Sequence, residues 1–99
     1  MGRLEGDKQM LKIKQGFLLR KMMNAHVVVA VGEAGREFNG MIRLNDAGMW
    51  LWQEMQAGIE RAELVEKMLE RYEALERTVA EADLDEFLDA VRFAVEEDQ

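Results

Sequence analysis

FNGMIRLNDAGMWLW, residues 38–52, is the stretch that decides the fold of this chain, because it is expected to join a strand directly to a helix. Asn39-Gly40 predicts a turn, since both residues tolerate the positive φ that tight turns require. The β-prone run Met41–Leu44 follows it. Asn45 is suited to cap a helix, because its side chain can accept a hydrogen bond from a first-turn amide.

The helix behind this cap is expected to organise the core. Leu51, Trp52 and Met55 recur at helical spacing, and two tryptophans close together supply a large apolar surface for a small domain. Gly58 is the usual type of residue just past a helix end, so we expect the helix to close at about Ala57.

Length and composition bound the class of protein. A chain of 99 residues with 48% hydrophobic and 33% charged residues fits one globular domain. It has no apolar run of the roughly twenty residues that cross a bilayer, no N-terminal signal pattern and no cysteine, so we expect a cytoplasmic protein without a membrane partner. The lack of cysteine also excludes disulfides, thiolate metal sites and a cysteine nucleophile.

The net charge of −7 is unevenly distributed along the chain. Residues 1–45 carry eight basic and four acidic side chains, whereas residues 46–99 carry five basic and sixteen acidic ones. Such an acidic surface repels a polyanion, so we expect no nucleic acid partner.

The N-terminal half predicts three strands. Residues 1–10 are polar and without period, and we expect a flexible tail over residues 1–11, followed by one domain over residues 12–95. Phe17–Met22 is an apolar run that suits a first strand, and His26–Val31 is rich in valine on both faces, which favours a central strand. Met41–Leu44 is the third.

The C-terminal half predicts two more helices after the first. In the second, an amphipathic period follows Gly58, and in the third, which begins at Glu76 or Thr78, an apolar stripe runs through Val95. Residues 96–99 are expected to be frayed. A run of strands followed by a run of helices predicts an α+β fold, a winged helix-turn-helix with a three-stranded antiparallel sheet followed by three helices.

The side chains do not form a pattern typical of an enzyme. His26 is the sole histidine, and a single histidine at a strand start is usually structural, because acid–base or metal chemistry needs a partner group. The carboxylates of the helices fall at solvent-facing spacings, and the eight methionines are typical of an adaptable core or binding surface. We therefore expect no catalytic residue, no metal and no cofactor.

A resemblance points to binding instead. The valine-rich second strand, the junction MIRLNDAGMWLW, Gly58 before an amphipathic helix that ends in Tyr72, and FLDAV at residues 87–91 together resemble the coenzyme PQQ synthesis protein D family. The resemblance covers residues 12–95. It implies a non-catalytic peptide-binding module, also called a RiPP recognition element, that binds the leader segment of a ribosomally made precursor peptide and presents it to a radical SAM enzyme or another maturase.

As the resemblance implies, the leader adds a strand to the third strand, in a groove whose other wall is the third helix. Glu60 stands where the family often has a Ser or Thr cap, and Ala94 where a Gly commonly ends the third helix. The implied peptide-binding residues are Met41, Ile42, Arg43, Leu44, Leu84, Phe87, Leu88, Val91 and Val95.

The period of a strand predicts how the groove is lined. If Ile42 and Leu44 face the core, Met41 and Arg43 face the opposite side. On the third helix, Phe87 and Leu88 cannot both face one partner, and we expect Leu88 and Val91 to line the groove.

Two other functions remain open at this stage. A winged helix is also typical of DNA-binding regulators, and the chain could be a structural subunit of a larger enzyme. An open strand edge can also pair with a second copy of the chain, so we expect a homodimer in the free state.

Overall fold

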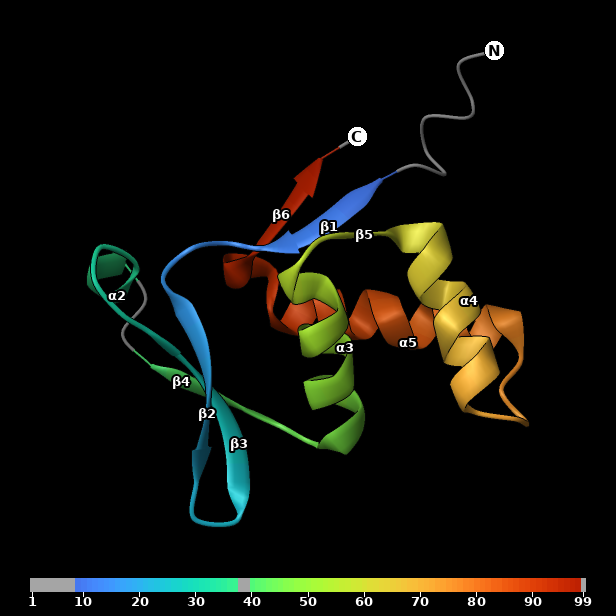
Figure 1. Ribbon diagram of the computed structural model, residues 1–99, viewed down its shortest axis with the longest axis horizontal. Coiled ribbons are helices and arrows are strands. Elements are labelled where there is room, and N and C mark those ends of the chain that lie inside the picture. Colours follow the sequence, from blue (N-terminus) through green and yellow to red (C-terminus); the bar gives the residue numbers. More distant parts are fainter. Residues whose placement is uncertain (1–8, 38–39, 99) are drawn as a thin grey trace.

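Two small antiparallel sheets lie beside a group of helices in the computed structural model, which describes residues 9–37 and 40–98 (Figure 1). The α+β class is confirmed. Part of the predicted turn at Asn39-Gly40 and most of the predicted tail lie outside the described residues.

The sheet β2-β3-β4 contains the three predicted strands. β2 (Phe17–Met22) pairs with β3 (Ala25–Ala30), and β3 pairs with β4 (Met41–Leu44), both antiparallel. The valine-rich β3 is central, as its composition predicts. A one-turn helix, α2 (Ala34–Glu37), lies between β3 and β4.

A second sheet, of order β5-β1-β6, was not predicted. β1 (Met10–Ile13) pairs with β5 (Ile59–Glu60) and with β6 (Val95–Asp98). The expectations of a flexible tail up to residue 11 and of frayed residues 96–99 were therefore wrong for residues 10–11 and 96–98. The strands of this sheet have only two to four residues, and their pairing joins segments far apart in the chain, which no local pattern reveals.

The first helix forms as its sequence predicts. α3 (Asp46–Gln56) begins after Asn45, whose Oδ1 accepts a hydrogen bond of 2.8 Å from the backbone N–H of Gly48. At the other end, Gly58 has a φ of +93°, and its N–H donates to the carbonyl of Met55.

Of the remaining helices, α4 lies where it was predicted and α5 ends earlier than predicted. α4 (Arg61–Arg71) begins after Glu60, which makes no side-chain capping bond, and α5 (Arg77–Ala90) begins after Glu76. The expectation that the third helix runs through Val95 was wrong. The chain leaves α5 at Ala90, makes a 3₁₀ turn at Arg92–Ala94 (η1) and enters β6, because Val95 pairs with Ile13 of β1.

The core lies between the helices and both sheets. Trp52 and Met55 of α3, Leu64 of α4, Leu84 of α5 and Leu11 of β1 are all fully buried. Large-area burial of this kind is the main stabilising term for a chain of this size. None of the helices in the described ranges is long and apolar enough to cross a bilayer.

Gly16 makes the corner between β1 and β2 that lets one segment of chain serve both sheets. Its φ is +94°, and a Cβ on it would lie 2.8 Å from the Cβ of Ala34. Its carbonyl accepts a hydrogen bond of 2.7 Å from the N–H of Val31. Both the conformation and the close approach require glycine here.

Candidate functional site

The strand β4 has an open edge on the side away from β3. The order β2-β3-β4 gives it one neighbour among the described strands, with Val28 opposite Ile42 and His26 opposite Leu44. The unpaired amides and carbonyls of such an edge are a template for an added strand. β4 is thus able to accept a peptide in an extended conformation.

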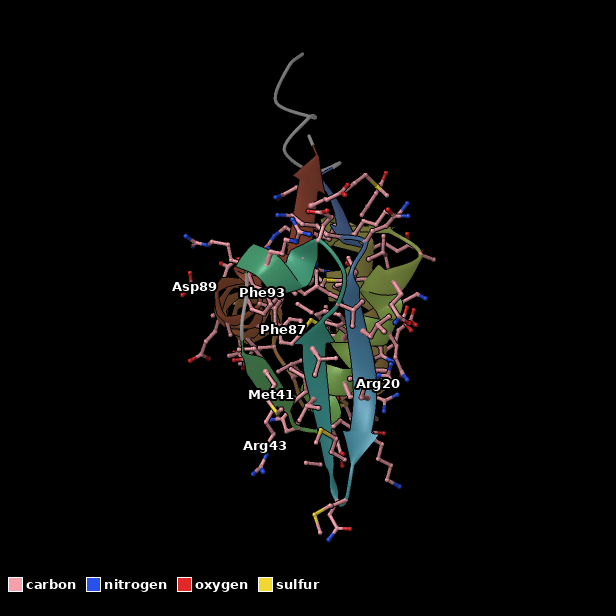
Figure 2. The ribbon with its side chains drawn as sticks, turned by 90° about the vertical axis from the view of Figure 1, so that its left-hand side faces the viewer. Arg20, Met41, Arg43, Phe87, Asp89 and Phe93 are labelled. Atoms are coloured by element: carbon pink, nitrogen blue, oxygen red, sulfur yellow. The ribbon has the colours of Figure 1, made fainter. Side chains whose placement is uncertain are left out.

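The side chains of β4 alternate between two faces, as predicted. Leu44 is buried and Ile42 is half-buried, whereas Met41 is 55% exposed and Arg43 is exposed. Figure 2 shows Met41 and Arg43 projecting from β4 to the same side. A strand added beside β4 would therefore meet an apolar side chain and a guanidinium.

The side of α5 that packs on the core contains residues that were expected to line the peptide groove. Leu84, Leu88 and Val91 are buried in the core, and so is Val95, which belongs to β6. The expectation that Leu88 and Val91 line a groove was wrong. Residues 84, 88 and 91 follow one another at helical spacing, so burying one of them buries all three.

Phe87 is the predicted α5 residue that remains accessible. It is half-buried, and its Cε1 lies 3.3 Å from the position that a Cβ on Gly48 would take. The same position lies 3.6 Å from the Cβ of Leu44 and 3.3 Å from the Oδ1 of Asn45. The end of β4, the start of α3 and the side of α5 meet at this glycine, which explains why the junction needs a residue without a side chain.

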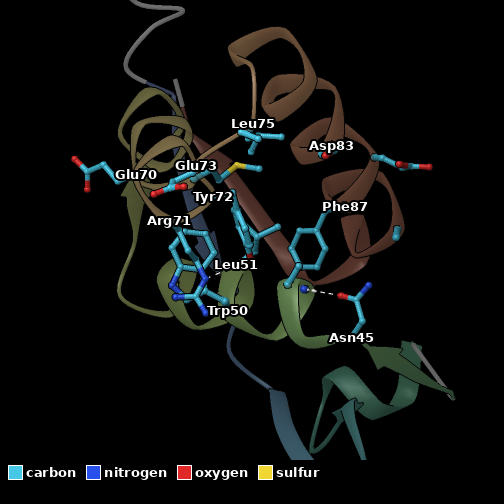
Figure 3. Close-up of a pocket in the computed structure, with 16 residues that line it drawn as sticks. Asn45, Trp50, Leu51, Glu70, Arg71, Tyr72, Glu73, Leu75, Asp83 and Phe87 are labelled. Carbon is cyan, nitrogen blue, oxygen red and sulfur yellow. Dashed lines mark hydrogen bonds between the residues drawn. The ribbon is translucent and has the colours of Figure 1, made fainter.

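A cavity of about 1150 Å³ opens beside this meeting point, between α3, the end of α4, the turn that follows it, and α5 (Figure 3). This cavity was not predicted from the sequence. Its apolar wall consists of Trp50, Leu51, Met68, Tyr72, Leu75 and Phe87.

Arg71 is held against the aromatic wall of the cavity. Its guanidinium carbon lies 4.9 Å from the ring centroid of Trp50, and its Nε donates a hydrogen bond of 3.3 Å to the Tyr72 hydroxyl. The rings of Trp50 and Tyr72 meet edge to face with centroids 6.3 Å apart. A guanidinium over the face of an aromatic ring is attracted by the quadrupole of the ring, which favours this position for Arg71.

The lining of the cavity also contains four carboxylates, which outnumber the single guanidinium of Arg71: Glu70, Glu73, Asp83 and Glu86. All four are exposed, and none makes an ion pair within the described part of the chain. The cavity thus combines an apolar wall with a negative rim.

Sequence reasoning missed Trp50 and Tyr72 as surface residues. The sequence pattern places Trp50 in the apolar surface of its helix and Tyr72 at the end of an amphipathic helix. The available signal was the position of Trp50 two residues before Trp52, which places the two indoles on different sides of one helix. Trp52 is fully buried and Trp50 is not.

His26 lies in β3, half-buried, opposite Lys21 on one side and Leu44 on the other. No group of three His, Asp or Glu side chains within residues 9–37 and 40–98 is arranged to hold a metal ion.

Comparison with protein families matches residues 25–92, more than half of the chain, to a family described as Coenzyme PQQ synthesis protein D (PqqD). The match begins at β3 and ends just after α5, so it contains β4, α3 and the whole lining of the cavity. No curated protein and no solved structure matched the chain.

Proposed function

Since this chain belongs to the coenzyme PQQ synthesis protein D family, we propose that it is a non-catalytic adaptor that captures the leader segment of a ribosomally synthesised precursor peptide by strand addition and presents it to a radical SAM enzyme or another maturase. Members of the family are accessory, chaperone-like proteins of PQQ biosynthesis, a pathway that starts from a ribosomally made peptide, and they associate with that peptide and with a radical SAM enzyme.

The open edge of β4 is the observation that carries the proposal. It supplies unpaired backbone groups, and Phe87 of α5 stands at the end of the strand as an accessible apolar contact. Main-chain hydrogen bonds give such a complex its affinity, and the side chains on either face of the added strand give it specificity.

The expected affinity follows from the size of this edge. β4 has four residues and offers a few main-chain hydrogen bonds, each worth about 1 kcal/mol net. One or two apolar anchors add about 1.5 to 3 kcal/mol each. Because association and ordering of the peptide cost several kcal/mol, we expect a dissociation constant nearer micromolar than picomolar.

The charge of the helices supports a peptide over duplex DNA. A recognition helix contacts phosphates and base edges with Lys and Arg, whereas α5 carries a single Arg77 and five carboxylates, at residues 81, 83, 85, 86 and 89. Bringing these carboxylates to a phosphate backbone would be repulsive.

The experiment that tests the proposal removes an amide from the open edge. Successive N–H groups of an edge strand point alternately to the partner strand and to solvent, so one of Ile42→Pro and Arg43→Pro deletes an edge amide and the other deletes a bond to β3. Circular dichroism identifies the variant that stays folded. Calorimetry then measures its binding of a synthetic leader peptide, taken from the precursor that we expect a neighbouring gene to encode. We expect this binding to weaken about tenfold because one bond to the peptide is lost.

The matched control lies on the opposite edge of the same sheet. Leu19→Pro and Arg20→Pro in β2 form the equivalent pair, and the folded member should bind the leader as the wild type does. A folded β4 variant that binds the leader with unchanged affinity would refute strand addition at β4.

A further inference from the structure

The cavity lies on the path of a peptide that leaves the end of β4. Asn45 follows the last residue of β4 and lines the cavity, and Phe87 stands beside both. Figure 3 shows Phe87, Tyr72 and Leu51 facing one another across the opening, with Asn45 at the side from which β4 arrives. A strand rises about 3.3 Å per residue, so a peptide paired with Leu44 would reach the cavity within its next few residues.

We infer that this cavity is a second recognition subsite for the same peptide, which takes a short segment with a large apolar side chain flanked by Lys or Arg. The inference rests on the proposed function and adds the chemical class of sequence that the site selects. The apolar wall supplies the pocket for the anchor, and the four rim carboxylates supply the preference for cations.

The size of the cavity fits a segment of several residues. Its volume of about 1150 Å³ lies slightly above the range of roughly 300 to 1,000 Å³ that is usual for ligand sites. A single side chain would leave most of that space to water. An anchor together with its neighbours on either side brings their charged ends to the rim.

The rim carboxylates make no ion pair in the described part of the chain, and of the four only Glu70 acts on a nearby lysine, Lys67. Among the described residues that line the cavity, Arg71 alone is basic, and its guanidinium contacts Trp50 and the Tyr72 hydroxyl on the wall. Glu73, Asp83 and Glu86 therefore face solvent without an ion pair in the described part of the chain. A Lys or Arg of the peptide would find them free to pair.

The charge of the binding surface changes sign between the β4 edge and the cavity. This change fixes the order of acidic and basic residues in a peptide that binds both. Arg43 projects beside the strand-addition edge, whereas the cavity beyond Asn45 is negative. A peptide that fits both parts carries its acidic or neutral residues in the segment that pairs with β4 and its basic residues in the segment that fills the cavity.

The probe for this inference is a displayed library of random peptides of about ten residues, long enough to cover β4 and the cavity. Peptides selected on the wild-type protein should be enriched in an aromatic or large aliphatic residue with Lys or Arg next to it. The strongest of them is then synthesised and titrated by calorimetry. In a Trp52→Phe background Trp50 is the only tryptophan of the chain, and its fluorescence should change as the cavity fills.

The decisive variant is Asp83→Asn combined with Glu86→Gln, which neutralises two rim carboxylates on the exposed surface and leaves the core intact. The selected peptide should bind it roughly tenfold more weakly, and the loss should shrink at high salt. Glu81→Gln combined with Glu96→Gln is the matched control, since it removes the same charge from exposed positions outside the cavity. It should leave the affinity within about twofold of wild type.

The outcomes separate this inference from the proposed function. In one outcome, the selected peptides bind the folded β4 proline variant more weakly, show no preference for basic residues, and bind the Asp83→Asn, Glu86→Gln protein as tightly as wild type. This result would refute the cavity subsite and would still support strand addition. Peptides that depend on the rim carboxylates but not on β4 overturn strand addition and with it the continuous path proposed here. A library that yields no binder refutes both the cavity subsite and strand addition. A free protein that is a dimer, and that the rim substitutions dissociate, refutes both as well, because a second copy of the chain then fills the cavity.

Discussion

Phe87 and Leu88 are neighbours on α5, yet Leu88 is packed in the core whereas Phe87 lies with its ring edge beside Gly48 of α3. Leu88 therefore contributes mainly to stability, whereas Phe87 contributes accessible apolar surface. Two substitutions on one turn of helix therefore test the orientation of α5.

Leu88→Ala should destabilise the protein by about 2 to 5 kcal/mol, because it leaves a hole in a closed core. Phe87→Ala should cost less than the roughly 3 to 5 kcal/mol of a fully buried Phe, since its ring is only half-buried, but it should weaken binding of the leader peptide. Urea unfolding and calorimetry measure the two effects. Equal stability losses would mean that α5 is rotated from the position described.

Val91→Asp should abolish cooperative unfolding at neutral pH. Val91 is fully buried, and an unpaired carboxylate there costs several kcal/mol, which is comparable with the 5 to 15 kcal/mol of total stability usual for a domain. Val79→Asp is the matched control, because Val79 is 45% exposed at the start of the same helix. It should change stability by less than about 0.5 kcal/mol. A folded Val91→Asp protein would contradict the burial of this face.

Asn45→Ala should lower stability by about 1 kcal/mol, because it removes the acceptor for the Gly48 N–H at the start of α3. Asn45→Asp should retain most of that stability, since a carboxylate accepts the same hydrogen bond and is favoured at the positive end of the helix. Chemical denaturation of the three proteins provides the measurement. If alanine and aspartate were equally harmful, the cap would not be the reason.

The ion pair between Lys67 of α4 and Glu54 of α3 should make stability fall in the alkaline range. The hydrogen bond of 2.9 Å from the Lys67 ammonium to Glu54, and then the charge of Glu54, raise the pKa of Lys67 above its usual 10.5. Its contribution is therefore complete below pH 10.5 and is lost as the pH rises through the higher folded-state pKa. Urea midpoints measured across that range should fall less in Glu54→Gln than in wild type.

A control for this alkaline effect is available on the other side of α4. Arg77 pairs with Glu66, so this ion pair contains no lysine ammonium. Glu66→Gln should therefore follow the wild-type pH dependence. If both variants flattened the curve equally, the specific role of Lys67 would be disproved.

Local chemistry made the strand-to-helix junction predictable. Asn45 and Gly58 mark the two ends of α3 through their own conformations and hydrogen bonds, and Met41–Leu44 shows its alternation within four residues. Each of these features depends on neighbours in the chain, so the sequence contains what is needed to recognise it.

The remaining features depend on distant segments. Whether Phe87 or Leu88 faces the core is decided by what packs against α5, since both lie within one broad apolar stripe. β6 exists because Val95 meets Ile13 of β1, and the cavity exists because Trp50 and Tyr72 come from two helices that meet in space. The helical period of residues 84–91 was correct, but it could not reveal where the helix would stop.

The pairing of β1 with β6 has a consequence for how this domain combines with others. Met10 stands opposite Asp98, so the chain enters and leaves the domain at one place, in the sheet that does not contain β4. Domains whose ends lie close together tolerate insertion into a loop of another protein as well as fusion at either end. Insertion of this domain into a loop of a larger enzyme therefore needs only two short linkers, and it leaves the β4 edge accessible.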